Sequence, residues 1–232
     1  MHVSVIVPAA GSGLRFGADI KKQYLPLNGR PLVAHCLQVF EDCADIRGVV
    51  LVVPETDTDY CENEIVRRYG FSKVGAVVPG GAQRHDSVFE GLKALKNGKG
   101  SLDAEPEYVL VHDGARPFLS MELLESCIES VRKYDAAVCA VPVKDTIKQT
   151  DEQGFVVSTP ARDMLRAVQT PQAFRFSLLY EAYEKLLSQG GEALESITDD
   201  AMVVERAMPS QRIFLLQGDD ANIKITVKGD MP

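Results

Sequence analysis

The chain has 232 residues, of which 45% are hydrophobic and 25% are charged, and this balance is typical of a folded globular protein rather than a disordered one. A chain of this length buries roughly 70% of its surface on folding, which is enough for one continuous core. The count of 25 Lys and Arg against 33 Asp and Glu gives a net charge of −8. This acidic balance disfavours nucleic acid and anionic membranes as partners.

The cysteines and the hydropathy pattern indicate the compartment. Five cysteines form an odd set without a CxxC pair, which predicts neither a disulfide framework nor a zinc site. We therefore expect buried thiols in a reducing environment. No apolar run approaches the ~18 residues of a membrane span, and the first residues lead directly into a strand without a secretory signal. The sequence thus predicts a cytoplasmic protein.

Short β-branched runs alternate with segments of helical periodicity over the first 143 residues. Strands are expected at Val3–Pro8, Gly48–Pro54, Lys73–Val78, Tyr108–Asp113 and Ala136–Val143. Helices are expected at Pro31–Cys43, Asp59–Tyr69, Arg84–Lys96 and Met121–Tyr134. This alternation predicts an α/β fold with a doubly wound, mostly parallel sheet that has helices on both faces.

The alternation breaks after Val143. Residues Lys144–Thr159 alternate in polarity around a turn and predict a β-hairpin inserted into the α/β domain. Because an isolated hairpin is marginally stable, we expect it to pack against something else, such as a second subunit. The remaining predicted elements are two helices capped by their first residues, Ser177–Gln189 and Thr198–Met208, and two strands, Arg212–Gln217 and Ile223–Val227. We predict one domain, residues 1–232, with an arm at about 142–163.

A glycine loop, Pro8-Ala-Ala-Gly-Ser-Gly-Leu-Arg-Phe-Gly17, follows the first predicted strand. Ligands of open α/β sheets bind at this end of a strand, and glycines let the backbone N–H groups approach a phosphate. Arg15 and the pair Lys21-Lys22 flank the loop, and several cations suit a triphosphate better than a diphosphate bridge.

A nicotinamide dinucleotide site is the rival interpretation of this loop. Gly11 and Gly13 fit the start of its glycine fingerprint, and Glu55 ends the second predicted strand, where the ribose-binding acid belongs. Phe16 occupies the position of the third glycine, however, and no helical pattern opens there.

Two further motifs follow later strands. The stretch Pro79–Ser87 can present backbone groups and the Ser87 side chain to a base. The fourth strand ends in His-Asp113-Gly-Ala-Arg116-Pro, and a carboxylate at a strand end is a natural Mg²⁺ ligand beside phosphate oxygens, although Asp113 could also cap a turn. Arg116 is expected to hold Asp113 in place rather than to touch substrate.

Together these motifs resemble the 2-C-methyl-D-erythritol 4-phosphate cytidylyltransferases of isoprenoid biosynthesis. The resemblance covers nearly the whole chain, in the order PAAGSGLRFG, KKQYL, GGAQRHDSV, HDGARP, PVKDTIK, ARDMLRAVQTPQAF, ITDDA and NIKIT. It implies a nucleotide-diphospho-sugar-transferase-like Rossmann variant and a homodimer in which each hairpin arm clasps the partner.

The resemblance also assigns roles to residues at matching positions. The cytidine and the triphosphate of CTP would be held by Ala9, Ala10, Gly11, Gly13, Gly80 and Ser87. Phosphate binding and transition-state stabilisation would fall to the catalytic residues Arg15, Lys22 and Lys224, and Mg²⁺ would bind Asp113. Methylerythritol phosphate would contact Thr146, Arg162 and Thr170, with Arg162 supplied by the neighbouring subunit's arm. Most of the motif cations are thus expected at one edge of the sheet.

Three positions depart from the family pattern. Ala82 stands where the family often has an acidic residue, so any side-chain role there is lost. Gly114 replaces an alanine, a change that we expect to be tolerated. After Thr226 the family usually continues with a Pro-Glu-Asp turn and a helix, which leaves open a short family member, a truncated chain or a piece of a bifunctional protein.

The implied reaction joins CTP and methylerythritol phosphate and releases pyrophosphate. Its nucleophile is an anionic phosphate oxygen, so no general base is required, and the sequence offers no obvious base-activated nucleophile. Three alternatives remain: cytidylyl transfer to ribitol 5-phosphate or a similar polyol phosphate, a nicotinamide-dependent oxidoreductase, and a nucleotide-binding module without catalysis.

Overall fold

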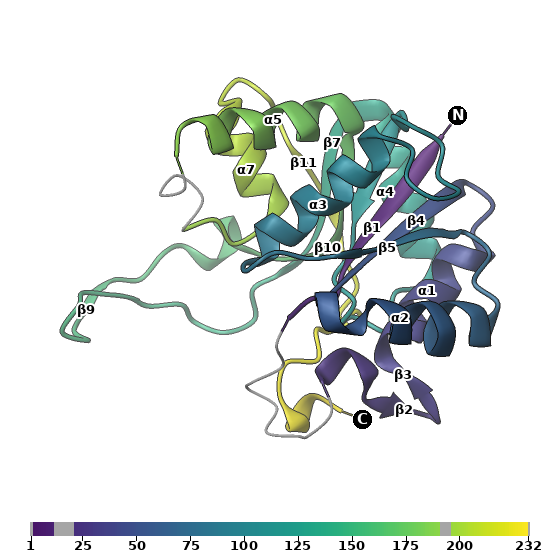
Figure 1. Ribbon diagram of the computed structural model, residues 1–232. Coiled ribbons are helices and arrows are strands. Elements are labelled where there is room, and N and C mark those ends of the chain that lie inside the picture. The colour runs from purple at the N-terminus through teal and green to yellow at the C-terminus, as the bar shows by residue number, and fades with distance from the viewer. Residues whose placement is uncertain (1, 12–20, 191–195, 232) are drawn as a thin grey trace.

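A seven-stranded sheet organises the chain in the computed structural model, which describes residues 2–11, 21–190 and 196–231 (Figure 1). The strand order is β11-β7-β10-β6-β1-β4-β5. In chain order these strands are β1 Val3–Pro8, β4 Ile46–Val53, β5 Val74–Pro79, β6 Tyr108–Val111, β7 Ala136–Pro142, β10 Arg166–Arg175 and β11 Phe214–Gln217. All neighbours are parallel except β10, which is antiparallel to both β6 and β7. The predicted mostly parallel sheet is confirmed.

Helices cover both faces of this sheet, as predicted for a doubly wound fold. They are α1 Leu32–Asp42, α2 Thr58–Tyr60 with its π-helical continuation η4 Cys61–Arg67, α3 Arg84–Lys96, α4 Met121–Tyr134, α5 Phe176–Ser188 and α7 Asp200–Ala207. Side chains of α1, η4 and α4 pack in one core cluster, whereas those of α3, α5 and α7 pack in another on the opposite face. No helix among the described residues is long and apolar enough to cross a membrane.

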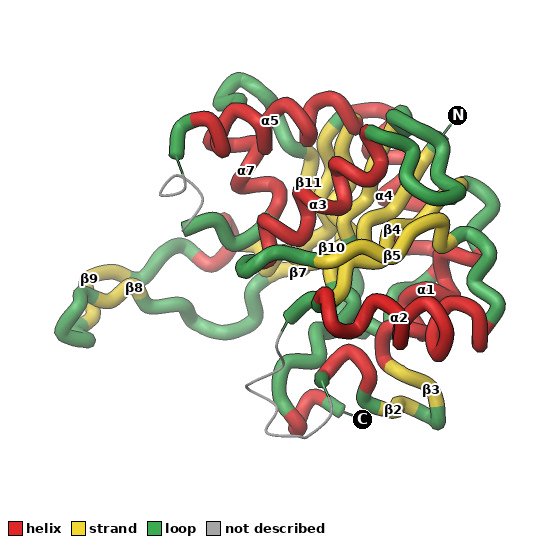
Figure 2. Tube along the Cα trace, viewed as in Figure 1, coloured by secondary structure: helices red, strands yellow, loops and turns green. Residues whose placement is uncertain are grey.

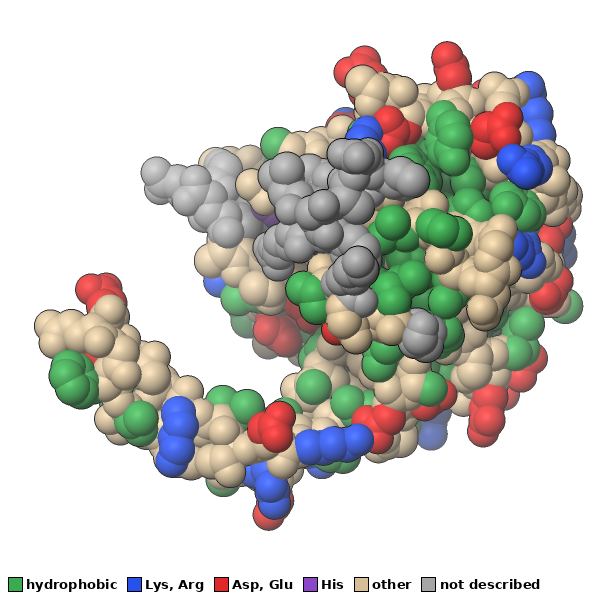
Figure 3. Space-filling model, turned by 90° about the horizontal axis from the view of Figure 1, so that it is seen from below, with side chains coloured by type: hydrophobic (Ala, Val, Ile, Leu, Met, Phe, Trp, Pro, Cys, Tyr) green, Lys and Arg blue, Asp and Glu red, His purple; other side chains and the backbone are tan. Residues whose placement is uncertain are grey.

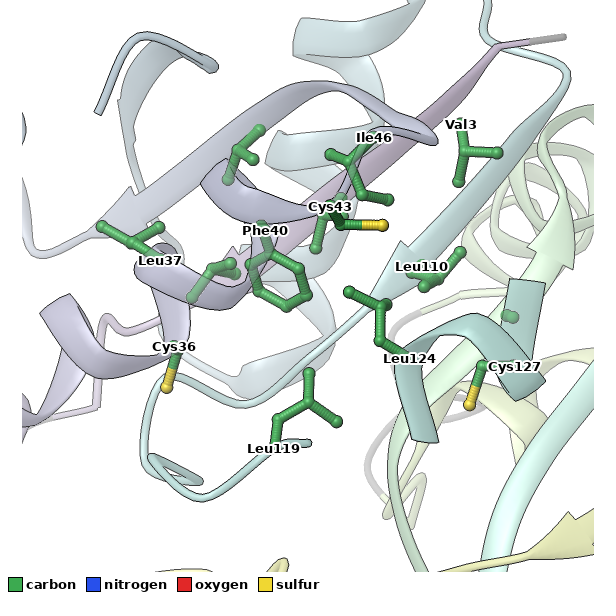
Figure 4. Close-up of a cluster of buried hydrophobic side chains, with 14 of the residues drawn as sticks. Val3, Cys36, Leu37, Phe40, Cys43, Ile46, Leu110, Leu119, Leu124 and Cys127 are labelled. Atoms are coloured by element: carbon green, nitrogen blue, oxygen red, sulfur yellow. The ribbon is translucent and has the colours of Figure 1, made fainter. Parts of the chain in front are cut away.

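The first core cluster explains why the central strands are apolar throughout. Phe40 of α1 and Leu124 of α4 meet Val3 and Leu110 of the sheet (Figure 4). Ile6 points to the other face and joins the second cluster, so β1 is buried on both sides. Each such side chain stabilises the fold by about 1.5–3 kcal/mol through burial.

The inserted hairpin consists of β8 Gln149–Thr150 and β9 Val156–Ser158, and it lies between β7 and β10 in the chain. It stands away from the body of the protein (Figures 2 and 3), and most of it is loop (Figure 2). Its surface is apolar in places: Phe155 is 69% exposed and Met164 is 83% exposed.

Short elements complete the chain. They are the two-stranded ladder β2 Pro26–Leu27 with β3 Arg30–Pro31, and the 3-10 turns η2 Lys22–Tyr24, η3 Glu55–Asp57, η5 Arg162–Met164 and η6 Lys228–Asp230.

Several predicted details are wrong. Strand β10 escaped prediction because it contains Pro171, which lacks the N–H that a strand ladder needs. The predicted strand Ile223–Val227 does not form; its segment runs beside the loop after β6, where the Ile225 N–H donates to the Ala115 oxygen over 2.9 Å.

The predicted caps of the last two helices are also displaced. Helix α5 begins at Phe176, with Arg175 rather than Ser177 at its N-cap. Helix α7 begins at Asp200, and its N-cap is Asp199, whose carboxylate accepts from the N–H of Met202. The shift from Thr198 to Asp199 puts two adjacent carboxylates at the beginning of α7.

Candidate active site

The carboxyl ends of four neighbouring parallel strands form one edge of the sheet. Strand β1 leads into Ala9, β5 leads into Gly80, and β6 leads into His112 and Asp113. Because ligands bind at this edge in open α/β sheets, the fold brings the predicted motifs to the expected place.

Gly80 packs closely against both Ala10 and Ser87. A Cβ on Gly80 would be 2.5 Å from the Cβ of Ala10 and 2.6 Å from Oγ of Ser87, so only glycine fits there. Gly11 has open space around it, since a Cβ there would meet nothing within 4 Å. These positions form a small cradle with exposed backbone, whereas Gly13 and Arg15 lie outside the described residues.

Asp113 is buried between two cations. Its Oδ1 accepts from Nε of Arg84 over 3.0 Å, and its Oδ2 lies 2.7 Å from Nζ of Lys224. Burial by itself would raise the pKa of Asp113, but these two cations outweigh it and hold that pKa well below its usual range. Asp113 is therefore ionised throughout the physiological pH range.

The expectation that Arg116 holds the Asp113 carboxylate is wrong. Nη1 of Arg116 instead donates to the backbone oxygen of Asn222 over 2.6 Å, and Arg84 and Lys224 hold Asp113. Arg84 was not among the predicted site residues, although it stands in the GGAQRHDSV motif beside Gly80 and Ser87. Its position at the start of α3, three residues after a strand-end glycine pair, is the signal that could have identified it.

A chain of buried hydrogen bonds connects Asp113 to Thr170, His112 and Asn222. Thr170 accepts from the Asp113 N–H over 3.1 Å, and its hydroxyl lies 3.2 Å from Nδ1 of His112. Burial lowers the pKa of His112 to about 4, so this imidazole is neutral. Nδ2 of Asn222 donates to the Thr170 oxygen over 2.8 Å, which ties the segment before Lys224 to β10.

A cavity of about 220 Å³ opens over this network, and its lining includes Arg84, Asp113, Arg116, Thr170, Thr198 and Lys224. The lining is mostly charged and polar, and it carries three cations, Arg84, Arg116 and Lys224, against two carboxylates, Asp113 and Asp199. Of the motif cations that the structure describes, Arg84, Arg116 and Lys224 line this cavity, whereas Arg15 lies outside the described residues.

Thr146 and Arg162 do not line this cavity. Arg162 lies at the base of the arm, where its Nη1 donates to the Lys144 oxygen over 3.0 Å beside a separate hollow of about 470 Å³. Thr146 is exposed on the arm. Within one subunit, the arm residues and Asp113 therefore belong to different surfaces.

The adjacent lysines Lys21 and Lys22 interact with different acidic residues. Lys21 forms an ion pair with Asp57, at 2.6 Å and 2.8 Å from its two carboxylate oxygens, and Tyr24 donates to the same carboxylate over 2.9 Å. Lys22 begins the turn η2. Hydrogen bonds from Thr226 and Val227 lower the pKa of Asp230 below its usual value, and the nearby charge of Lys22 makes a smaller contribution in the same direction. Lys21 thus anchors the segment that carries Lys22.

Comparisons with known proteins agree on one family. The model of 2-C-methyl-D-erythritol 4-phosphate cytidylyltransferase matches residues 3–232. Proteins of that name from Geobacter metallireducens and Geotalea uraniireducens are 43% and 42% identical over 231 residues, which is 100% of this chain and 95% and 94% of theirs. A crystal structure of 4-diphosphocytidyl-2C-methyl-D-erythritol synthase from Anaerococcus prevotii has a TM-score of 0.82 at 36% identity, covering 99% of this chain and 92% of that one.

These matches extend over all the motifs that meet at the strand ends, and they support a nucleotidyltransferase rather than a nicotinamide-dependent oxidoreductase. The chain belongs to the 2-C-methyl-D-erythritol 4-phosphate cytidylyltransferase family.

Proposed function

We propose that this protein transfers the cytidylyl group of CTP to 2-C-methyl-D-erythritol 4-phosphate and releases pyrophosphate. The observation that carries the proposal is the ionised Asp113 held between Arg84 and Lys224, beside the cradle of Ala10, Gly80 and Ser87. Family membership supplies the substrates, and the cationic cavity suits their phosphates.

The chemistry requires positioning and charge neutralisation. A phosphate oxygen of the alcohol phosphate attacks the α-phosphorus of CTP in line, and the bond from that phosphorus to the bridging oxygen of the β-phosphate breaks. Because the second pKa of a phosphate monoester is about 6, the nucleophile is already anionic near neutral pH and needs no base. Arg15, Lys22 and Lys224 would neutralise the two approaching anions. Gly11 and Gly13 would bring their backbone to the triphosphate, and Ala9 would contact the nucleotide.

Asp113 is suited to a Mg²⁺ ion. A carboxylate offers about four lone-pair sites, and Arg84 and Lys224 use two of them. Mg²⁺ is usually bound by one or two carboxylates together with substrate phosphates, so a single Asp is enough. No group of three His, Cys, Asp or Glu side chains in the described part of the chain forms a cage for a metal. The ion would neutralise part of the negative charge on the CTP phosphates.

The arm would form a homodimer. Phe155, Val156 and Val157 are each at least 60% exposed near its tip, and apolar surface of this kind marks interaction sites. In the dimer, Arg162 and Thr146 would reach the partner's cavity and bind methylerythritol phosphate together with Thr170. The five unpaired, buried cysteines favour a reducing, cytoplasmic compartment.

A pyrophosphate-release assay tests the function. Purified protein with Mg²⁺ and CTP is offered methylerythritol phosphate or ribitol 5-phosphate at equal concentrations. Turnover with methylerythritol phosphate at least about tenfold faster supports the proposal. Preference for ribitol phosphate would assign the alternative substrate, and tight CTP binding without turnover would indicate a nucleotide-binding module.

A further inference from the structure

Arg84 connects the cavity to a second, buried carboxylate. Its Nε donates to Oδ1 of Asp113 over 3.0 Å, and its Nη2 donates to Oδ2 of Asp200 over 2.8 Å. Asp113 follows β6, Arg84 opens α3 and Asp200 opens α7, so one guanidinium joins three elements that are far apart in the sequence.

Asp200 is itself hydrogen-bonded at both carboxylate oxygens and at its backbone N–H. Its side chain is 0% exposed, and its Oδ1 accepts from the hydroxyl of Tyr183 over 2.8 Å. Its backbone N–H and that of Ala201 donate to Oε1 of Gln172, over 3.0 Å and 2.9 Å. A carboxylate held by this many hydrogen bonds restricts where the Arg84 guanidinium can lie.

Charge balance explains why the bridge is stable. Burial by itself would lower the pKa of Arg84, but the carboxylates of Asp200 and Asp113 outweigh it and raise that pKa above its ordinary value. Breaking such a pair by removing one partner leaves the other charge buried and uncompensated.

We propose that Arg84 and Asp200 are positioning residues that fix the orientation of the Asp113 carboxylate, with Tyr183 as their anchor in helix α5. The inference rests on the proposed function, in which Asp113 faces the metal and the phosphates. With Oδ1 held by Arg84, Oδ2 is turned toward Lys224 and the cavity. Because Arg84 also borders the cavity, direct contact with a substrate phosphate is the rival role.

Three variants separate positioning from direct contact. Arg84→Met removes the bridge, and a displacement of about 1 Å in a reacting group can cost about 100-fold, so we expect kcat to fall about 100-fold. Asp200→Asn keeps the shape of the side chain and should lower kcat about tenfold, with the KM for CTP changed less than about threefold. Arg84→Lys should not restore activity, since one ammonium group cannot donate along two fixed directions as the guanidinium does.

The double variant provides the sharpest comparison. If Asp200 acts through Arg84, the Asp200→Asn change should add nothing to Arg84→Met, because residues in one network are not additive. Multiplied effects, or a normal kcat in folded Asp200→Asn, would overturn the proposal. Tyr183→Phe should lower kcat about two- to fivefold, whereas Tyr180→Phe, on the same helix with its ring packed 5.9 Å from that of Phe89, is the matched control.

A structural measurement keeps this test apart from the test of the function. Crystal structures of the wild type and of Asp200→Asn give the orientation of the Asp113 carboxylate whatever the substrate is. A rotated Asp113 in the variant supports the bridge even if methylerythritol phosphate proves to be the wrong acceptor. An unchanged Asp113 refutes it even if the wild type turns over CTP as proposed.

Discussion

The hydroxyl of Thr170 accepts a hydrogen bond from the backbone N–H of Asp113 over 3.1 Å. The proton of the Thr170 hydroxyl is also used in a hydrogen bond. Nε2 of His112 lies 3.1 Å from the Arg116 oxygen, which can only accept, so in the neutral imidazole Nδ1 accepts from the Thr170 hydroxyl. One lone pair of Thr170 remains, and a substrate group that contacts it must therefore be a donor.

Replacing Thr170 should therefore affect stability as well as activity. Thr170→Val leaves the Asp113 N–H and His112 Nδ1 buried without partners. We expect the free energy of unfolding to fall by about 2 kcal/mol. Thr170→Ser keeps the hydroxyl and should stay within about 1 kcal/mol of the wild type. Urea unfolding of the three proteins measures both values, and equal stability of the Val and Ser variants would contradict the hydrogen-bond chain.

His112 predicts a pH dependence of stability. The pKa of His112 in the folded protein, about 4, lies below the value near 6.5 of an unfolded histidine. The stability that the neutral imidazole contributes is therefore complete above pH 6.5 and is lost as the pH falls toward 4. At pH 4 the loss amounts to about 3 kcal/mol relative to pH 7. His112→Asn retains an acceptor for Thr170 and should lose correspondingly less. Parallel pH profiles of the two proteins would show that His112 is not buried neutral.

The contact at Gly80 predicts a graded steric effect. Gly80→Ala would force a Cβ to 2.5 Å from that of Ala10, so the cradle must open, and we expect the KM for CTP to rise about tenfold or more. Gly114→Ala brings a Cβ only to 3.1 Å from that of Ala9, which calls for a small shift, and KM should change less than about threefold. Steady-state kinetics decide the matter, and the reverse ranking would contradict the packing of this edge.

The adjacent lysines form a matched pair. Lys22→Ala should lower kcat about 10²–10³-fold while the fold survives, as the loss of a preorganised donor does in other enzymes. Lys21→Ala removes the ion pair with Asp57 and should lower kcat less than about tenfold. Circular dichroism checks the fold, and near-normal turnover of Lys22→Ala would remove it from the catalytic set.

Mixed dimers of the proposed homodimer test whether Arg162 acts on the partner's site. Arg162→Ala and Lys22→Ala subunits should each be inactive alone. After unfolding and joint refolding in equal amounts, half of the dimers are mixed, and each mixed dimer regains one intact site, so about a quarter of wild-type activity should return. No regain, in material that is dimeric by light scattering, would mean that Arg162 serves its own subunit.

The sequence allowed the parallel part of the fold to be predicted because its strands are local apolar runs such as β1 and β4, and each is followed by a periodic helix. It did not predict β10, because this strand contains Pro171, a residue that is rare inside strands. The pairing of β10 depends on β6 and β7, which are distant in the sequence. Asp200 and Asn222 each resembled surface polar residues, yet both are 0% exposed. Burial of this kind depends on neighbours that are distant in the chain.

By itself, the sequence determined the family, the α/β alternation and the strand-end motifs, because these features depend on residue types at short, fixed spacings. Only the tertiary structure decided which charges meet. It paired Lys21 with Asp57, left Arg162 on the arm, and joined Arg84 to both Asp113 and Asp200. The energy of an ion pair depends on distance and burial in three dimensions, and neither can be read from separation along the chain.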